Sequence, residues 1–465
     1  MAMSMSAVPA AHPASDSVLL ELWDGLVATA PDAPAVIEAA DGLTLGRRAL
    51  DQRASEWLAA VAATRSLKGL RVAFALPNGA TWMSVFLGLL KAGATPVPLD
   101  ASEPPLSQRE LARHAGAAFL WTGETLEPVG HARRDLRPLC VVKLTSGSTG
   151  VPRALPFTQG EMLADARQVC RTMDIRPEDT NLAIVPFGHS YGLGNLTVPL
   201  LAFGVAALCV SAPLPHAIAA DVARWRPTVF PAVPALLRVL ALSDLPADAL
   251  ASIRTVISAG SALSAETAQT FYQKYHVLVH GFYGSSETGG ISYDRSGEAT
   301  LAGRSVGTPL EGVSTHLSTG QRFCVESAAV FTHGNRRRSG AGFGQYRPAD
   351  RAELNTLGEL VLLGRAGRMM KIAGRRLDLA EFEQSLRRVE GIQDAFAAPH
   401  PDQPEELAVV LATTLPVEQV RTRLRGELAS WKLPRRLMVV AEFPLTGRGK
   451  TDTRALREML RRESE

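Results

Sequence analysis

A segment rich in glycine and hydroxyl side chains, LTSGSTGVP, occupies residues 144–152 directly after an apolar stretch. Gly147 and Gly150 would let the backbone approach a phosphate closely, and successive N–H groups could form a nest for an anion. The GxxxxGK[ST] spacing of a Walker A loop is absent. By itself, the segment fits an ordinary polar loop as well as a phosphate-binding loop.

A second segment, GFYGSSETGG at 281–290, combines an aromatic ring with a carboxylate. Tyr283 offers a flat face for a purine, Gly284 permits close approach, and Glu287 is the kind of ligand that Mg²⁺ prefers. Asp350, in YRPAD, could accept hydrogen bonds from two ribose hydroxyls. Because an Asp in a turn is commonly only an Asx-turn former, these features indicate a function only in combination.

The elements that would position these residues alternate between strand and helix. The expected strands are 71–76, 95–99, 117–121, 139–144, 181–186 and 253–258. The expected helices between them include 82–92, 161–173 and 265–274. This alternation predicts an α/β fold with parallel sheets covered by helices, in which ligands bind beyond the carboxyl ends of the strands. After residue 364, a small α+β unit is expected, with helices near 379–389 and 417–431 and strands near 394–398 and 407–412.

Length and composition favour a multidomain globular protein. The 465 residues exceed the ~250–300 at which a single hydrophobic core stops growing, so at least two domains are expected. A formal charge of +3 provides no field of one sign to attract nucleic acid. Four separated cysteines, with no CxxC pair, argue against a disulfide framework and structural zinc, and favour a reducing, cytoplasmic location.

The most apolar stretch, 196–220, is interrupted by prolines and by Gly204. It predicts a buried helix followed by a strand, with no membrane span. Residues 1–17 lack the layout of a secretory signal.

Five segments stand in the order, and at roughly the intervals, found in one superfamily. They are the two described above, YRPAD, GRAGRMMKIAGRRLDLAEFE (364–383) and FPLTGRGKTD (443–452). The chain resembles the adenylate-forming (AMP-binding) superfamily of acyl-CoA synthetases, aryl-acid ligases, peptide-synthetase adenylation domains and luciferases, and is most similar to acyl and aryl acid:thiol ligases. The resemblance implies a large N-terminal domain (1–365) of several subdomains that holds ATP and the acyl group, and a small, mobile α+β C-terminal lid domain (366–465).

The resemblance also implies a role for individual residues. Those expected to bind ATP are Thr145, Ser146, Gly147, Ser148, Thr149, Gly150, Arg153, Gly260, Ser261, Ala262, Tyr283, Gly284, Ser285, Ser286, Thr288, Asp350 and Arg365. Among these, 145–150 would hold the β- and γ-phosphates, Tyr283 would stack on adenine, and Asp350 and Arg365 would bind the ribose. Gly260, Ser261 and Ala262 would line the adenine and acyl pocket.

Catalysis is expected to depend on Glu287, as the Mg²⁺ ligand, and on Lys450. When a carboxylate attacks the α-phosphate two anions meet, so Mg²⁺ and a lysine that neutralise the developing charge would lower the barrier. By resemblance, Lys450 enters from the C-terminal domain, which then turns about a hinge at Gly367. Lys371 and Gly374 would line the tunnel for the pantetheine thiol.

Two departures from the family pattern concern ATP. Arg153 replaces the lysine that commonly ends the phosphate loop, and its planar guanidinium does not copy an ammonium. Ser286 replaces a threonine and keeps the hydroxyl. Neither change removes a group that the chemistry requires.

The acid is expected to be a fatty or aryl acid. In the peptide-synthetase branch an Asp pairs with the α-amino group, but the corresponding stretch here, 185–195, carries Gly188 and His189 and no carboxylate. An α-ammonium would therefore be buried unpaired. His189 resembles a histidine beside the reacting carboxylate, and a packing histidine is the equal alternative.

The acceptor is expected to be CoA or a carrier-protein phosphopantetheine. Two basic groups could contact CoA phosphates or an acidic carrier protein, although a solvated surface is the simpler interpretation. They are Arg421, Arg423, Arg425 and Lys432, Arg435, Arg436. An enzyme that loads only a carrier protein, and a catalytically silent binding relative, remain as alternatives.

Overall fold

A computed structural model describes nine stretches of the chain. They are residues 17–62, 66–130, 132–145, 152–318, 322–332, 344–365, 369–372, 374–444 and 452–462. The chain forms two compact units. The first contains most residues up to 366, and the second contains 367–465 together with 102–110 and 145–153.

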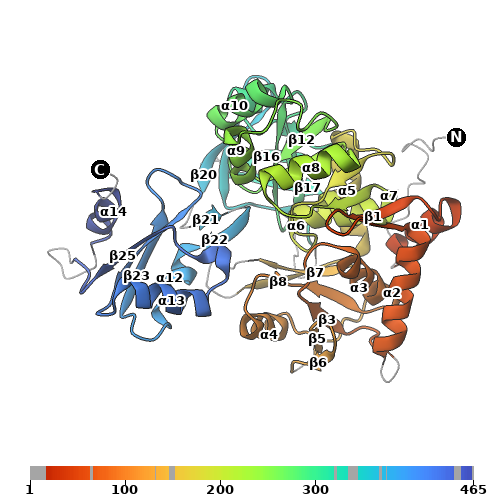
Figure 1. Ribbon diagram of the computed structural model, residues 1–465, viewed down its shortest axis with the longest axis horizontal. Coiled ribbons are helices and arrows are strands. Elements are labelled where there is room, and N and C mark those ends of the chain that lie inside the picture. The colour runs from red at the N-terminus through yellow and green to blue at the C-terminus, as the bar shows by residue number, and fades with distance from the viewer. Residues whose placement is uncertain are drawn as a thin grey trace. The chain divides into compact units, whose positions relative to one another are not determined.

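The largest sheet of the first unit has nine strands in the order β15-β14-β13-β12-β11-β9-β10-β1-β2 (Figure 1). Its pairings from β13 to β1 are parallel, and β14, β15 and β2 pair antiparallel at the edges. The strands are β1 (Pro34–Glu38), β2 (Leu43–Gly46), β9 (Thr180–Leu182), β10 (Ala206–Cys209), β11 (Val229–Ala232), β12 (Thr255–Ser258), β13 (Val279–Ser285), β14 (Gly289–Tyr293) and β15 (Thr308–Pro309). The expected parallel sheet is confirmed, but the antiparallel edge after β13 was not expected. It arises because the chain reverses within GSSETGG, where Gly289 has φ +68°, a value that favours glycine.

Each face of this sheet packs in a different core, because side chains alternate along a strand. Phe230 and Val256 belong to one core, together with residues of α8 (Pro215–Trp225), α9 (Pro234–Leu242) and α10 (Ala265–Tyr275). Val229 and Ile257, their neighbours in sequence, belong to the other core. That core contains residues of α1 (Val18–Thr29), α2 (Arg47–Ala62), α3 (Ala80–Lys91), α5 (Gln159–Thr172) and α7 (Val198–Phe203). The sheet is therefore covered by helices on both faces, as expected for parallel strands.

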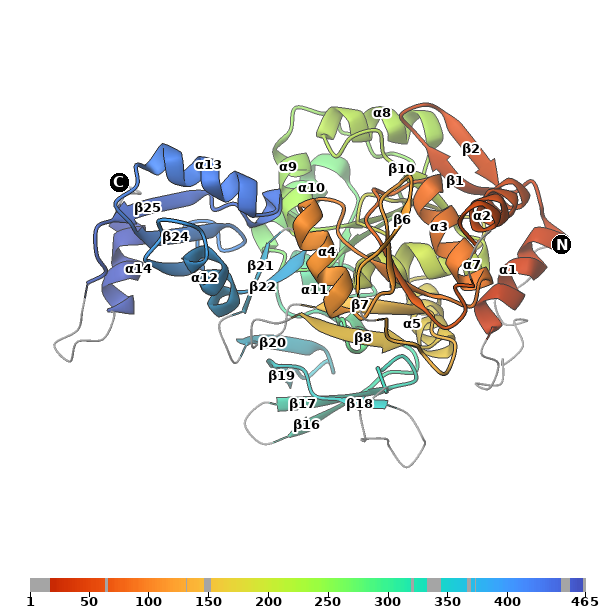
Figure 2. The same cartoon turned by 90° about the horizontal axis from the view of Figure 1, so that it is seen from below.

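Three smaller sheets complete the first half of the fold. One has the order β4-β3-β5-β6 and one pairs β7 with β8. The third is an antiparallel sheet of β16 to β20, whose strands lie side by side in Figure 2. Their bounds are β3 (Arg71–Phe74), β4 (Thr95–Pro98), β5 (Phe119–Trp121), β6 (Leu126–Pro128), β7 (Val141–Thr145), β8 (Arg153–Phe157), β16 (Ser314–Ser318), β17 (Arg322–Ser327), β18 (Gly344–Tyr346), β19 (Asp350–Leu354) and β20 (Leu360–Arg365). The remaining helices are α4 (Pro105–His114), α6 (Ser190–Gly192), the π-helix η2 (Leu193–Thr197) and α11 (Glu298–Leu301).

The C-terminal part of the second unit has its own two-sided core. The sheet β23-β24-β25 packs α12 and α13 in one core and α14 in the other. Its elements are β21 (Met369–Ile372), β22 (Arg375–Asp378), α12 (Leu379–Arg387), β23 (Asp394–Pro399), β24 (Leu407–Ala412), α13 (Val417–Glu427), the 3₁₀ helix η4 (Ser430–Lys432), β25 (Arg436–Val440) and α14 (Thr453–Arg462). The helix expected to reach residue 431 ends at Glu427, because Leu428 is extended and buries its side chain in this core.

The other expected helices and strands are confirmed, and their ends differ from the expected positions by at most four residues. The apolar stretch 196–220 forms α7, β10 and the start of α8. No helix in the described part of the chain is both long and apolar enough to cross a membrane.

Candidate active site

Four of the predicted site residues lie at or beyond the carboxyl ends of the central strands: His189, Gly260, Ser261 and Glu287. Gly260 and Ser261 follow β12, and Gly260 has φ +97°, which favours glycine. His189 lies beyond β9, and the segment with Glu287 begins where β13 ends. This is the edge at which α/β sheets bind ligands. Ala262, further along the loop after β12, is exposed.

Tyr283 and Asp350 are brought together from positions 67 residues apart in sequence. The hydroxyl of Tyr283, on β13, donates a hydrogen bond of 2.7 Å to Oδ2 of Asp350, the first residue of β19. Both side chains are buried. On the neighbouring strand, Arg365 is paired with Asp350 in the backbone register. Tyr283, expected to bind adenine, and Asp350, expected to bind ribose, are therefore in direct contact.

Glu287 lies in the turn between β13 and β14 and is 5% exposed. Its Oε1 accepts a hydrogen bond of 3.0 Å from the hydroxyl of Tyr346, and its backbone oxygen accepts one of 2.9 Å from Phe331 N–H. Within the turn, the hydroxyls of Ser285 and Thr288 are 2.9 Å apart. Tyr346 was missed by sequence reasoning, although it begins the YRPAD segment that was singled out for Asp350.

The far side of the same turn is held by Asp165 of α5. Its Oδ1 accepts a hydrogen bond of 2.9 Å from Gly290 N–H, and the carboxyl is 3% exposed. Burial raises the pKa of Asp165, and this effect is opposed by the nearby charge of Lys143 and by the Gly290 hydrogen bond. Neither Asp165 nor Lys143 was predicted. The signal for Lys143 was present, because a lysine within an otherwise apolar strand needs a partner.

The residues present fit a Mg²⁺ ion that arrives with a nucleotide. Among the described residues, no group of three or more His, Cys, Asp or Glu side chains could hold a metal ion. Mg²⁺ is commonly bound by one or two carboxylates, substrate phosphates and water, so a dedicated cage is not required. Glu287, oriented by Tyr346, provides one such carboxylate.

His189 has a charged neighbour. Its Nε2 lies 3.5 Å from Oδ2 of Asp100, and the imidazole is 33% exposed. The residue forms the N-cap of α6, which leads into the π-helix η2, an irregularity that is frequent at functional sites. The contact gives His189 a polar partner, and its role in catalysis stays a prediction.

The phosphate loop is only partly covered by the described residues. Thr145 ends β7 and is buried, and Arg153 begins β8 and is exposed. Residues 146–150 lie outside the described residues, as do Gly367 and Lys450. The same holds for the triple-arginine segment 333–343.

In the second unit, Lys371 lies on β21 and Gly374 connects β21 to β22 with φ +81°. The basic surface residues of this unit largely have acidic neighbours. Arg421, Arg423 and Arg435 lie 3.9, 3.6 and 3.4 Å from Glu418, Glu390 and Glu406. These contacts fit a solvated surface better than a preformed anion site.

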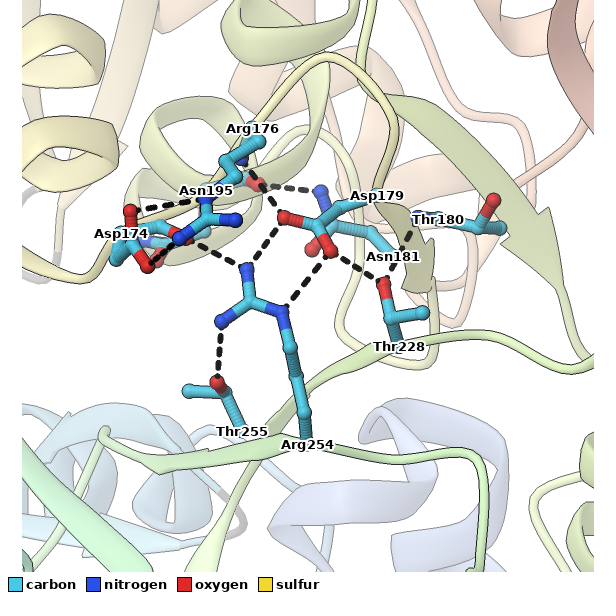
Figure 3. Close-up of polar contacts among 9 residues, drawn as sticks. All are labelled: Asp174, Arg176, Asp179, Thr180, Asn181, Asn195, Thr228, Arg254 and Thr255. Carbon is cyan, nitrogen blue, oxygen red and sulfur yellow. Dashed lines mark hydrogen bonds and ion pairs between the residues drawn. The ribbon is translucent and has the colours of Figure 1, made fainter.

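A dense polar network lies at the amino ends of the central strands, opposite the candidate site (Figure 3). Arg254, next to β12, donates from Nε and Nη2 to the two carboxylate oxygens of Asp179, at 3.1 and 2.5 Å. The hydroxyl of Thr228, next to β11, donates to Asp179 at 2.7 Å and accepts from the N–H of Thr180, the first residue of β9, at 3.2 Å. Arg254 Nη1 also donates to Thr255 at 3.0 Å. The network therefore ties together the amino ends of three parallel strands.

The pKa of Asp179 fits a structural role. Burial alone would raise it, but the hydrogen bonds from Arg254, the backbone N–H of Arg176 and Thr228 outweigh this effect and lower the pKa below its ordinary value. A carboxylate held ionised by three donors is a stabilising group. Because this edge lies away from the carboxyl ends of the strands, the network is not the active site.

Comparison with known proteins decides the family. The profile described as AMP-binding enzyme matches residues 24–138 and 124–322, and the profile described as AMP-binding enzyme C-terminal domain matches 381–450. The chain belongs to the AMP-binding enzyme family. The sequence-based recognition of the adenylate-forming superfamily is thereby confirmed.

Individual relatives of this AMP-binding enzyme are distant. The benzoate–CoA ligase of Thauera aromatica is 27% identical over 390 residues, which cover 77% of this chain and 74% of the relative. The phenyloxazoline synthase MbtB of Mycolicibacterium paratuberculosis is 26% identical over 92% of this chain, which spans 41% of that protein. An o-succinylbenzoate CoA synthetase from Bacillus subtilis superposes with a TM-score of 0.78 at 18% identity, over 94% of this chain and 98% of that chain. This last similarity concerns the fold.

Proposed function

We propose that the protein activates a fatty or aryl acid with ATP and Mg²⁺ and then transfers the acyl group to the thiol of CoA or of a carrier-protein phosphopantetheine. In the first step, a carboxylate oxygen bonds to the α-phosphorus, the bond to the β-phosphate breaks, and pyrophosphate leaves. In the second step, the thiol sulfur bonds to the acyl carbon, its proton is lost, and AMP leaves.

One observation carries this proposal beyond family membership. The hydrogen bonds Tyr283 to Asp350 and Tyr346 to Glu287 hold an aromatic ring and two carboxylates at one edge of the fold. Such a set can bind adenine, ribose and a nucleotide-bound cation, respectively. The Figure 3 network, by contrast, offers no aromatic face.

The chain's own residues divide the work of adenylation. The 145–150 loop and Arg153 would grip the outer phosphates, and Asp350 and Arg365 would fix the ribose. Glu287 would orient Mg²⁺, which neutralises phosphate charge. Lys450 would bring a second positive charge to the α-phosphate as the attack proceeds. Since the barrier is largely electrostatic, positioned charges are the main catalytic resource.

The proposed acid class follows from the absence of a carboxylate at the start of α6. Gly188 and His189 occupy this region, so an α-ammonium would lack the carboxylate that this helix start supplies in the peptide-synthetase branch. The nearby carboxylate of Asp100 lies 3.5 Å from His189 Nε2. A Cβ at Gly188 would lie 2.6 Å from the Pro98 side chain, so the backbone is closely packed. The relative named for benzoate supports an aryl acid, although the distance between the sequences leaves fatty acids within the proposal.

Thiol transfer is assigned to a second pose of the C-terminal domain, 366–465, relative to the domain 1–365. Gly367 would serve as the hinge, since glycine rotates at little steric cost. Lys371 and Gly374 would then face the pantetheine. We place the reaction in the cytoplasm, where CoA and reduced thiols occur, in keeping with four free cysteines.

Product analysis tests this proposal. The protein is incubated with ATP, Mg²⁺ and one of a panel of fatty, aryl and amino acids, with CoA, with a phosphopantetheinylated carrier protein, or with neither. Without a thiol acceptor, the expected product is an acid-dependent acyl-AMP. With an acceptor, the expected product is a thioester. Thioester only on the carrier protein would assign the acceptor to it, and no acyl-AMP with any acid, despite ATP binding, would favour a silent binding protein.

A further inference from the structure

Lys143 is a buried lysine that the chemistry above does not use. It lies on β7, two residues before the start of the phosphate loop, and is 2% exposed. Its Nζ has no hydrogen-bond partner among the described residues and lies 3.9 Å from the centroid of the Phe157 ring. An ammonium without partners is costly to bury, so a compensating charge is expected nearby.

That charge is Asp165. Desolvation lowers the pKa of Lys143. Among the charges that oppose this effect Asp165 contributes most, followed by Cys140, Glu161 and Glu287. Burial in turn raises the pKa of Asp165, which Lys143 opposes. Each group thus offsets part of the effect of burial on the other, and burial remains the larger influence on both pKa values.

The carboxylate of Asp165 is enclosed by glycine backbone. Its Oδ1 accepts from Gly290 N–H at 2.9 Å. A Cβ at Gly289 would lie 2.2 Å from Oδ1, and a Cβ at Gly194 would lie 2.6 Å from Oδ2. No larger residue fits at these two glycines while Asp165 stays in place. The carboxylate therefore fixes the backbone just after Glu287.

The Glu287 turn is also linked to Lys143 through two phenylalanine rings. The backbone oxygen of Glu287 accepts from Phe331 N–H, and the ring of Phe331 lies 5.4 Å from the ring of Phe157, centroid to centroid. Lys143 lies over this same Phe157 ring. The turn is thus held by Asp165, whose charge acts on Lys143, and by Phe331, which contacts the ring under Lys143.

We propose that Lys143 and Asp165 form a buried charge pair that positions Glu287 to bind the nucleotide-associated Mg²⁺. Both are positioning residues, since they act on the reaction through the Glu287 turn. The inference rests on the proposed function, and it adds two residues and a physical reason for their charges.

The pair predicts a specific pattern among neutral variants. Lys143→Met leaves Asp165 without its cation, and Asp165→Asn leaves Lys143 without its anion. The double variant removes both charges and keeps an oxygen that can accept from Gly290. A buried pair is more sensitive to loss of one partner than to loss of both.

The test measures acid-dependent pyrophosphate release against Mg²⁺ concentration for wild type, both single variants and the double variant. Rates are expressed per folded molecule, with folding followed by circular dichroism and thermal unfolding. Asp179→Asn is the matched control, because it also converts a buried carboxylate to an amide but lies at the opposite edge of the sheet.

Each single variant is expected to lose ~10-fold or more in rate and to need ~5-fold more Mg²⁺ for its half-maximal rate, whereas the double variant recovers most of both. Asp179→Asn should lower the unfolding temperature and leave the Mg²⁺ dependence unchanged. If a single variant does not fold, a folded double variant with near-wild-type Mg²⁺ dependence still supports the pair.

The pair would be overturned by single variants with wild-type Mg²⁺ dependence, or by a double variant as impaired as the worse single variant. In either case, an active wild type would still uphold the proposed function. A wild type that releases no pyrophosphate with any acid would overturn both.

Discussion

At the scale of single residues, the site depends on hydrogen bonds that hold carboxylates in place. Glu287 and Asp350 are each bonded to a tyrosine hydroxyl, from Tyr346 and Tyr283. A carboxylate that is already oriented loses little conformational freedom when it binds a cation or a hydroxyl. A fixed site therefore stabilises the bound group better than freely oriented water does.

Tyr346→Phe tests this orientation. The change removes the donor 3.0 Å from Oε1 of Glu287 and leaves the ring in place. We expect the rate of acid-dependent pyrophosphate release to fall ~10–100-fold, the scale for losing one hydrogen bond to a charged group. Tyr272→Phe, on the exposed side of α10, is the control and should retain the wild-type rate. Equal rates for both variants would argue that Tyr346 does not orient Glu287.

The sequence contained the chemical groups of the site but not all of their supports. Glu287, Tyr283 and Asp350 stand in short motifs whose residue types indicate their chemistry. Asp165 contacts Gly290 across 125 positions, and such a contact follows from the packing of α5 on the sheet rather than from any local pattern.

Among the elements, the central sheet keeps a stabilising polar network and the candidate site at opposite ends of its strands. Its amino edge carries the network of Asp179 and Arg254, and its carboxyl edge carries the candidate site. Strand–helix alternation predicted this arrangement, because parallel strands place all their carboxyl ends at one edge. The antiparallel reversal after β13 could not be predicted in the same way, since it depends on Gly289 adopting φ +68° within the fold.

The Asp179 network predicts how stability depends on pH. The pKa of Asp179 is lowered in the folded state. The stabilising contribution of this carboxylate is therefore complete above the unfolded pKa of ~3.9 and is lost as the pH falls through the lower folded pKa. Asp179→Asn should therefore lower the free energy of unfolding near pH 7 by ~1–3 kcal/mol, discounted because Arg254 is partly exposed.

The measurement is urea unfolding of both proteins from pH 7 to pH 2. The difference between wild type and Asp179→Asn should shrink below about pH 4 as the wild-type carboxylate protonates. A constant difference over this range would show that the ionised form of Asp179 is not what stabilises the amino edge.

In the whole molecule, the proposed reaction requires two domains that serve two half-reactions in turn. The C-terminal part has its own core, built around β23 to β25, which is what independent movement requires. The sequence predicted this part because its helix and strand periods are regular. The hinge and the lysine were predicted by resemblance, and both lie outside the described residues.

Gly367→Pro should separate the half-reactions. Proline fixes φ near −65° and would restrict rotation at the proposed hinge. We expect acyl-AMP formation to stay within ~3-fold of wild type while thioester formation falls ~10-fold or more, since only the second step needs the other pose. Both rates are measured on one preparation. An equal loss in both, or in neither, would contradict a hinge at this residue.

Lys450→Ala tests the proposed adenylation of a carboxylic acid, in which Lys450 is the mobile catalytic cation. The measurement is acid-dependent pyrophosphate release from ATP and Mg²⁺, comparing wild type with Lys450→Ala over the panel of acids. We expect release with a fatty or aryl acid and a fall of ~10²-fold or more in the variant, with ATP binding largely retained. Release that is equally fast in Lys450→Ala, or absent from the wild type with every acid, would contradict it.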